Sequence, residues 1–231
     1  MLELSIDTST RYASVCLSEK GQAIWEINWH SSQNHTIELT PAIASLFQKA
    51  DVAPKQLNSI FLALGPGGFS ALRVGMSVAK GMAEALNIPI LGIGTLEIEA
   101  MPFSSSGLPI VSVVEMGKSD IAWGVYEGSK KGLTCLRGEE VSAPEKVIAT
   151  APKGSLICGE GAKRLLPFAC SSNGKNSTIF HSEGQTRHAS CLAQLGYIRF
   201  SDFPIDNTIP MEPLYLKTPN ITPPKPKGRR V

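Results

Sequence analysis

The most informative stretch of the sequence is LALGPGGFSALRVG at residues 62–75. An apolar, strand-like run meets the turn Gly65-Pro66-Gly67-Gly68, and an apolar helix begins directly after it. Glycine allows positive φ, proline fixes a turn, and the exposed amides of a helix N-terminus favour an anion. The spacing matches neither a Walker A loop nor the GxGxxG dinucleotide motif. On these residues alone, anion binding by Gly65, Gly67 and Gly68 and a purely structural turn remain equally open.

The segments around this turn alternate between strand and helix patterns. Period-2 alternation predicts three strands in an antiparallel meander, at residues 2–10, 12–21 and 22–30. Helical periodicity predicts helices at 36–50, 69–86 and 95–101, and short apolar runs predict strands at 58–65 and 88–94. This order predicts an α/β unit.

A Ser-, Gly- and Pro-rich stretch at residues 102–109 is the best boundary between two units. Beyond it we expect a hairpin at 109–116 and 121–128, a strand at 154–161, a helix at 187–200 and a closing extended segment at 209–217. The sequence therefore predicts an N-terminal α/β lobe at residues 1–104, a smaller C-terminal α/β lobe at 105–216, and a basic, flexible tail at 217–231.

Composition points to a soluble globular protein. Hydrophobic residues make up 42% of the chain and charged residues 18%, and no run approaches the about 20 apolar residues of a membrane span. The N-terminus has no basic cluster of the signal-peptide kind, and five cysteines form no CxxC pair. We therefore expect a cytoplasmic chain without membrane contact. The net charge of +2 does not indicate nucleic-acid binding. The basic tail predicts a solubilising segment, with an RNA-binding arm as the alternative.

The first strand ends in Asp7-Thr8-Ser9-Thr10, which is a candidate ligand site. A carboxylate and hydroxyls on a tight turn can hold a metal-bound phosphate. An Asx-type turn that closes a hairpin is the preferred interpretation on these residues alone. Asp7, Thr8 and Ser9 are therefore candidate anion- or nucleotide-binding residues together with the glycine turn.

The helix at 69–86 is apolar around most of its circumference. Its polar residues form one narrow stripe, and two apolar rows fill the rest. A surface helix needs one apolar stripe, so either the chain covers both rows or a partner covers one of them. Small residues would let a second helix approach closely. We therefore expect a partner interface on this helix and the helix at 36–50, formed by Ile43, Phe47, Phe69, Leu72, Gly75, Met76, Val78, Ala79 and Met82.

Four motifs in order along the chain give it a resemblance to a known family. SIDTST, GPGGFSALRVG, ILGIGTLE and EPLYLK together resemble the TsaB (YeaZ) family. The resemblance implies an α/β fold of the actin-like/sugar kinase/Hsp70 (ribonuclease H-like) superfamily, with two lobes of which the second is degenerate. It also implies kinship with TsaD, which catalyses threonylcarbamoyl transfer to adenosine 37 of tRNAs that read ANN codons, the t6A modification.

The same resemblance implies a role without catalysis. TsaD binds its metal through two histidines four residues apart, and Thr95 and Glu99 stand at those positions here. A threonine and a glutamate do not reproduce a paired imidazole site. We therefore expect no catalytic residue and no metal, and a chain that is not an enzyme on its own. The alternative is a nucleotide-binding phosphotransferase or ATPase that uses Asp7 and the glycine turn.

The implied partners belong to one assembly. The resemblance implies a heterodimer with a TsaD-like protein, to which a TsaE-like ATPase is added, and contact with tRNA through the complex. No cofactor is expected to bind tightly to this chain, and ATP is expected to be bound or used at the level of the complex. The large apolar helix face favours a homodimer when the chain is alone.

Overall fold

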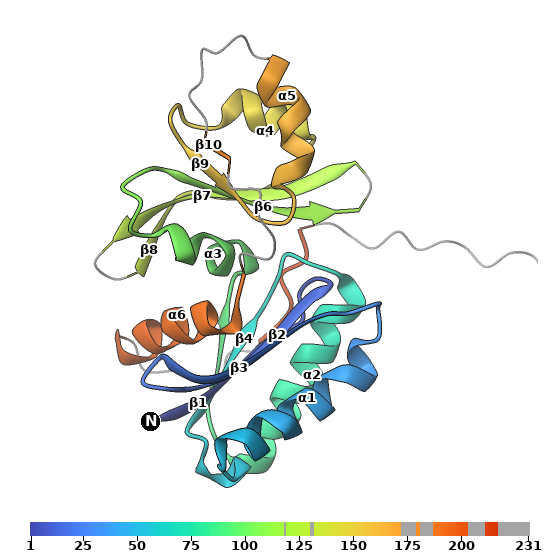
Figure 1. The fold of residues 1–231 in the computed structure, drawn as a ribbon, viewed down its shortest axis with the longest axis vertical. Helices are drawn as coiled ribbons and strands as arrows, with labels where there is room; N and C mark the ends of the chain where they lie inside the picture. The colour runs from blue at the N-terminus through green and yellow to red at the C-terminus, as the bar shows by residue number, and fades with distance from the viewer. Residues whose placement is uncertain (118, 130–131, 172–178, 181–186, 203–210, 217–231) are drawn as a thin grey trace, which may run out of the picture.

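A computed structural model describes the chain except for residues 118, 130–131, 172–178, 181–186, 203–210 and 217–231. The described residues form two lobes, each built on a five-stranded sheet (Figure 1). The tail predicted at 217–231 lies outside the described residues.

The first sheet has the strand order β3-β2-β1-β4-β5. Its strands are β1 (Leu2–Asp7), β2 (Tyr12–Glu19), β3 (Gln22–His30), β4 (Ser59–Ala63) and β5 (Ile90–Ile93). The first three form the expected antiparallel meander, and β4 and β5 add to β1 in parallel. Every residue of β4 is buried, as its apolar run predicts for a strand inside a sheet.

Helices cover both faces of the first sheet. On one face lie α1 (His35–Ala50) and α2 (Phe69–Leu86), which pack against each other. On the other face lies α6 (Ala189–Asp202), which contacts each of the five strands. The helix bounds follow local signals, because Asp51 and Asn87 take the left-handed conformation that ends α1 and α2.

The second sheet has the strand order β10-β9-β6-β7-β8. Its strands are β6 (Ile110–Met116), β7 (Asp120–Ser129), β8 (Gly132–Ser142), β9 (Leu156–Cys158) and β10 (Ile179–Phe180). The predicted hairpin is the antiparallel pair of β6 and β7. Helices α4 (Pro144–Thr150) and α5 (Leu166–Ser171) cover one face, and α3 (Thr95–Ala100) lies on the other, between the lobes (Figure 1). Short 3₁₀ helices occur at Pro54–Gln56, Met101–Phe103 and Ala162–Leu165.

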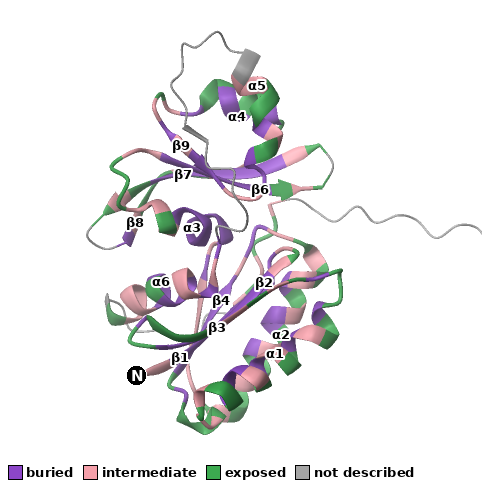
Figure 2. Ribbon diagram, viewed as in Figure 1, coloured by how far each residue is buried: buried purple, intermediate pink, exposed green. Residues whose placement is uncertain are grey.

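Two helices pack on the lobe opposite to the one that their position in the sequence predicts. Helix α3 precedes the expected boundary at residue 104, yet it packs on β6 and β7 of the second sheet. Helix α6 falls within the range 105–216 that we assigned to the second lobe, yet it packs on the first sheet. The division at residue 104 is therefore corrected, since each lobe is completed by a helix from the other side of it. All six residues of α3 are buried (Figure 2).

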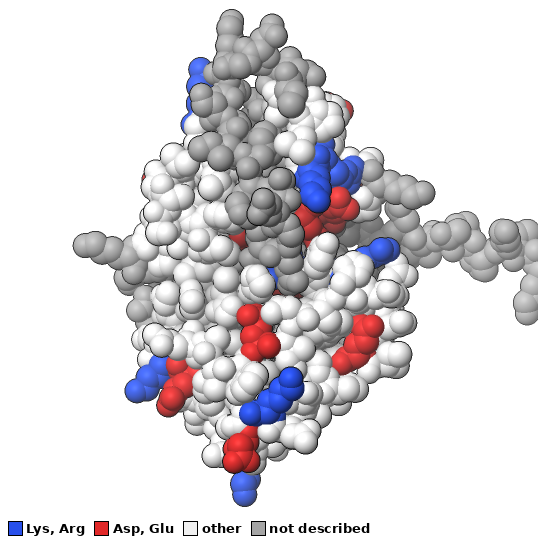
Figure 3. Space-filling view, in the orientation of Figure 1, with Lys and Arg blue, Asp and Glu red and all other residues white. Residues whose placement is uncertain are grey.

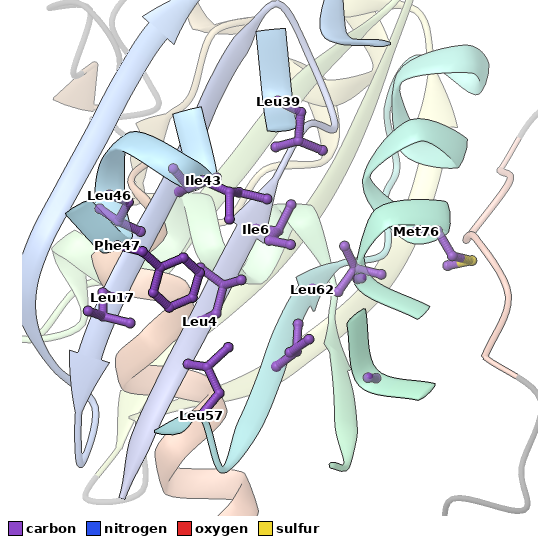
Figure 4. Packing of buried hydrophobic residues seen from close by; sticks show 14 residues of the cluster. Leu4, Ile6, Leu17, Leu39, Ile43, Leu46, Phe47, Leu57, Leu62 and Met76 are labelled. Atoms are coloured by element: carbon purple, nitrogen blue, oxygen red, sulfur yellow. The ribbon is translucent and has the colours of Figure 1, made fainter. Parts of the chain in front are cut away.

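The core of the first lobe contains most of the residues that we expected at a partner interface. Six of those residues are buried within the chain itself, namely Ile43, Phe47, Leu72, Gly75, Met76 and Ala79. Side chains of β1 and β4 face those of α1 in this core (Figure 4). The assignment of these six to an interface is corrected, because they are buried in the first lobe between the sheet and the two helices. Phe69, Val78 and Met82 are only partly buried and keep some exposed surface.

Glycine is required at position 75 because the side chain of Thr8 packs against it. A Cβ atom at Gly75 would collide with the hydroxyl of Thr8, and that hydroxyl donates a hydrogen bond of 2.8 Å to the carbonyl of Ala71. The glycine therefore admits the turn after β1 rather than a helix of a partner.

Residues 211–216, here called the C-terminal strap, run along α2 without forming a strand. The Leu214 amide donates to the Leu64 carbonyl at 2.7 Å, and Lys80 Nζ donates to the Met211 carbonyl at 2.6 Å. The Tyr215 ring lies 4.7 Å from the Phe69 ring, centroid to centroid. The closing segment expected at 209–217 is described only over the strap, which is an irregular surface segment.

Candidate functional site

The turn after β1 is an Asx-type turn. Asp7 Oδ1 accepts hydrogen bonds from the Ser9 amide at 2.8 Å and from the Ser9 hydroxyl at 2.5 Å. Asp7 and Ser9 have no exposed surface, and Thr8 has 2%. The structural interpretation of this turn is therefore confirmed, and one carboxylate oxygen is committed to it.

The second oxygen of Asp7 is held by Arg187, which the sequence analysis did not single out. Arg187 Nε donates to Asp7 Oδ2 at 2.5 Å, and Nη1 donates to Glu99 Oε2 at 2.9 Å. Nη2 donates to the Thr10 hydroxyl at 2.7 Å. The Arg187 side chain is 2% exposed, so this guanidinium replaces solvent at the carboxylate. Arg187 lies far from Asp7 in the sequence, and no local pattern marks it.

The charged groups of this cluster stabilise one another directly, because they are buried close together with little solvent around them. Burial acts to lower the pKa of Arg187, but the carboxylates of Asp7, Glu99 and Glu160 outweigh it and hold the pKa above its ordinary value. Burial raises the pKa of Glu99 to about 7, although the Arg187 charge opposes that rise. Burial also raises the pKa of Glu160. One guanidinium therefore serves several carboxylates in a nearly solvent-free site.

The glycine turn is bonded to the chain itself. The Gly68 amide donates to the Ser9 carbonyl at 2.7 Å, and the Gly65 amide donates to the Thr95 hydroxyl at 3.1 Å. A Cβ at Gly67 would overlap the Ser9 carbonyl. Glycine is therefore needed where the two turns touch, and the amides of Gly65 and Gly68 are not free for an anion.

The side chains around Asp7 do not form a site for a metal-bound phosphate. Both carboxylate oxygens of Asp7 already accept hydrogen bonds, and Glu99 is paired with Arg187. The hydroxyl of Thr95, at the other position where TsaD has histidine, bonds to the glycine turn. Within the described part of the chain, no group of three or more His, Cys, Asp or Glu side chains is placed to hold a metal ion.

A cleft of about 930 Å³ opens between the lobes beside this cluster. Its walls include residues 10–12 of the turn after β1, residues 68–71 at the start of α2, and Glu160 and Lys163 of the second lobe. Asp7, Thr8 and Ser9 do not line it. The structure thus brings the two predicted turns together but leaves only Gly68 of the six candidate anion-binding residues on the cleft wall.

The outer side of α1 and α2 is the second candidate site. We call it the α1–α2 face and define it by exposed small or apolar residues, together with Ser77. They are Ile37, Pro41, Ala44, Ser77, Gly81 and Ala85. Ile37 is 70% exposed, and a Cβ at Gly81 would meet no atom within 4 Å. Helical periodicity located both helices, but six of the nine interface residues predicted on them point inward and are buried.

Charge does not distinguish a further surface on the side seen in Figure 3. There, Lys and Arg are interspersed with Asp and Glu, and no large field of one sign covers the described residues. Among the described residues, no helix is long and apolar enough to cross a membrane.

Together these features define a two-lobed α/β protein in which Asp7 and two amides of the glycine turn are bonded within the chain itself. The family model described as TsaD, tRNA N6-adenosine threonylcarbamoyltransferase, matches residues 29–190. The chain is 30% identical to the tRNA threonylcarbamoyladenosine biosynthesis protein TsaB of Buchnera aphidicola subsp. Schizaphis graminum, across 70% of this chain and 80% of that protein. The chain belongs to the TsaB (YeaZ) family.

Further comparisons agree with this membership and with the fold. TsaB of Bacillus subtilis is 32% identical, with 58% of each chain matched. YeaZ from Pseudomonas aeruginosa superposes with a TM-score of 0.80 at 24% identity, over 93% of this chain and 99% of that one. A proposed N-acetylmannosamine kinase from Listeria monocytogenes, Lmo2764, superposes with a TM-score of 0.55 at 9% identity, over 88% and 100% of the chains. The expected superfamily fold is confirmed.

Removing the guanidinium should destabilise the protein strongly. Arg187→Met leaves Asp7 and Glu99 buried without a counter-charge, so we expect the free energy of unfolding to fall by about 3–5 kcal/mol. Arg11→Met changes an exposed arginine near the same turn and should stay within about 0.5 kcal/mol of the parent. Urea unfolding of both variants measures the difference, and equal stabilities would contradict the structural role of Arg187.

Proposed function

We propose that the chain is a non-catalytic partner of a TsaD-like enzyme in t6A modification of adenosine 37 in tRNAs that read ANN codons. Membership in the TsaB family supports this role, since its relatives are named tRNA threonylcarbamoyladenosine biosynthesis proteins. The observation that carries it is the occupation of Asp7 by Arg187 and Ser9. A carboxylate committed in this way is not available as a metal ligand or general base.

We propose that the TsaD-like partner docks on the α1–α2 face. Small residues at Ala44, Gly81 and Ala85 allow a helix backbone to approach closely, and Ile37 offers apolar surface. Of the interface residues expected from the sequence, Phe69, Val78 and Met82 can still contribute through their exposed parts. The remaining six are core residues and support the face from beneath.

The other partners follow from the same proposal. A TsaE-like ATPase joins the heterodimer, tRNA is contacted through the complex, and the assembly works in the cytoplasm. In the absence of the enzyme, the α1–α2 face pairs with a second copy of this chain. Homodimer and heterodimer would then compete for one surface, because a two-fold contact uses the same patch on both copies.

Arginine on the α1–α2 face should block docking without unfolding the chain. Ala44→Arg and Gly81→Arg place a long charged side chain on exposed helix positions, and we expect each to weaken binding to the TsaD-like protein at least about tenfold. Ala149→Arg is the matched control, since Ala149 is exposed on α4 of the second lobe.

Surface plasmon resonance with the TsaD-like protein measures these affinities, and circular dichroism checks that each variant is folded. If both face variants bind as tightly as the Ala149→Arg control, docking through this face is wrong.

We propose that ATP acts at the level of the complex and that no cofactor binds tightly to the isolated chain. The open cleft beside the start of α2 leaves room for a nucleotide between the two lobes of this chain. A phosphotransferase or ATPase would need Asp7, and the Arg187 contact argues against that alternative.

Calorimetry of the isolated chain with ATP and Mg²⁺ should give a dissociation constant above about 1 mM, without hydrolysis. Micromolar binding, with turnover that disappears in the Asp7→Ala variant, would favour the enzyme instead.

A further inference from the structure

Helix α3 belongs to the second lobe through its packing. It lies against β6 and β7, and the Cys158 thiol of β9 donates a hydrogen bond of 3.6 Å to the Glu99 carbonyl. A Cβ at Gly159, just after β9, would lie 3.0 Å from Glu99 Cγ. Helix α3 is also held by the first lobe, because the Thr95 amide donates to the Gly65 carbonyl at 2.7 Å, so it joins the second sheet to the first lobe.

The segment that contains Arg187 and α6 belongs to the first lobe. Helix α6 packs on the first sheet, the Ser190 amide donates to Glu26 of β3 at 2.9 Å, and Arg187 Nη2 donates to Thr10. The arginines of this segment therefore move with the first sheet.

Two ion pairs cross from this segment to α3. Arg187 reaches Glu99 at 2.9 Å, where both side chains are at most 2% exposed. Arg199 Nη2 lies 2.5 Å from both carboxylate oxygens of Glu97, with side chains 42% and 11% exposed. The pairs lie one turn of α6 or more apart along their segment, so together they restrain rotation as well as separation.

The C-terminal strap is a third tie between the lobes. Met211 packs against the core of the first lobe, and Leu216 packs against the cluster formed by α3 and the second sheet. Between them, the Leu214 amide is bonded to the Leu64 carbonyl at the end of β4. The strap thus joins the two cores across the side of α2.

We propose that these three ties lock the two lobes in one relative arrangement, so that the cleft keeps its width whether or not a nucleotide is present. Opening the lobes would separate Arg187 from Glu99, and breaking a buried ion pair of this kind is strongly unfavourable. It would also break the Arg199 pair and detach one end of the strap. This inference concerns the isolated chain and does not depend on the proposed function.

If the lobes are locked, the cleft and the α1–α2 face keep a constant position relative to each other. Helix α2 forms part of the cleft wall through residues 68–71 and part of the α1–α2 face through Gly81 and Ala85. A locked hinge keeps both surfaces in one mutual orientation, which lowers the conformational cost of forming a complex.

Spin labels on the two lobes test the lock directly. Gln48→Cys on α1 and Ala149→Cys on α4 are exposed positions, labelled in a full-length chain whose Cys135, Cys170 and Cys191 are replaced by Ala. Double electron–electron resonance should give one narrow distance distribution, and millimolar ATP with Mg²⁺ should leave it unchanged. A broad distribution, or a shift on adding ATP, would overturn the proposal.

Substitutions in the Arg199–Glu97 ion pair and in the C-terminal strap test whether these contacts fix the distance between the lobes. Arg199→Ala combined with Leu214→Pro removes the half-exposed ion pair and the amide donor of the strap, and leaves the buried Arg187 cluster intact for folding. We expect a second, longer-distance population in this double variant. The matched control is Arg11→Ala combined with Ala143→Pro, which changes an exposed arginine and an exposed alanine whose φ of −67° already suits proline. A single narrow distribution in the double variant, identical to that of the parent, would overturn the assignment of these ties.

Discussion

The ion cluster around Arg187 joins the turn after β1 to helix α3. A single buried guanidinium bonds to Asp7 at the end of β1, to Thr10 in the following turn and to Glu99 on α3. Because buried charges are stable only when they are paired, these three elements must meet at one point. The turn after β1 then lies against the glycine turn, and α3 is held between the lobes.

In this arrangement the glycine turn and Asp7, which resemble parts of a ligand site, instead form hydrogen bonds within the chain. Glycine is required at 65 and 67 because the Leu214 carbonyl approaches the first and the Ser9 carbonyl the second, and the amides of Gly65 and Gly68 bond within the chain. This chain thus keeps a strand-turn-helix geometry at the glycine turn without a free carboxylate at the end of β1. What remains open to other molecules is the outer side of α1 and α2 and the interlobe cleft.

Sequence patterns predicted the elements well and the long-range contacts poorly. The helix at 69–86 has the expected bounds, because Gly68 and Asn87 are local signals. Periodicity could not say what covers each apolar row, so Leu72 and Ala79 were placed at an interface although they lie in the core. Chain order placed α6 in the wrong lobe. Arg187 was missed because its partners Asp7 and Glu99 are distant in sequence, and a lone arginine before a helix carries no pattern.

The central claim is that the chain supports t6A formation as a partner and not as the catalyst. It is tested most directly by reconstituting the modification from a purified TsaD-like protein, a TsaE-like ATPase and a tRNA that reads ANN codons, with this chain left out and then added back. If the chain acts as a partner, we expect no t6A without it, recovery on adding it back, and no t6A from this chain when the TsaD-like protein is omitted. Equal t6A formation with and without the chain, or modification by this chain without the TsaD-like protein, would contradict it.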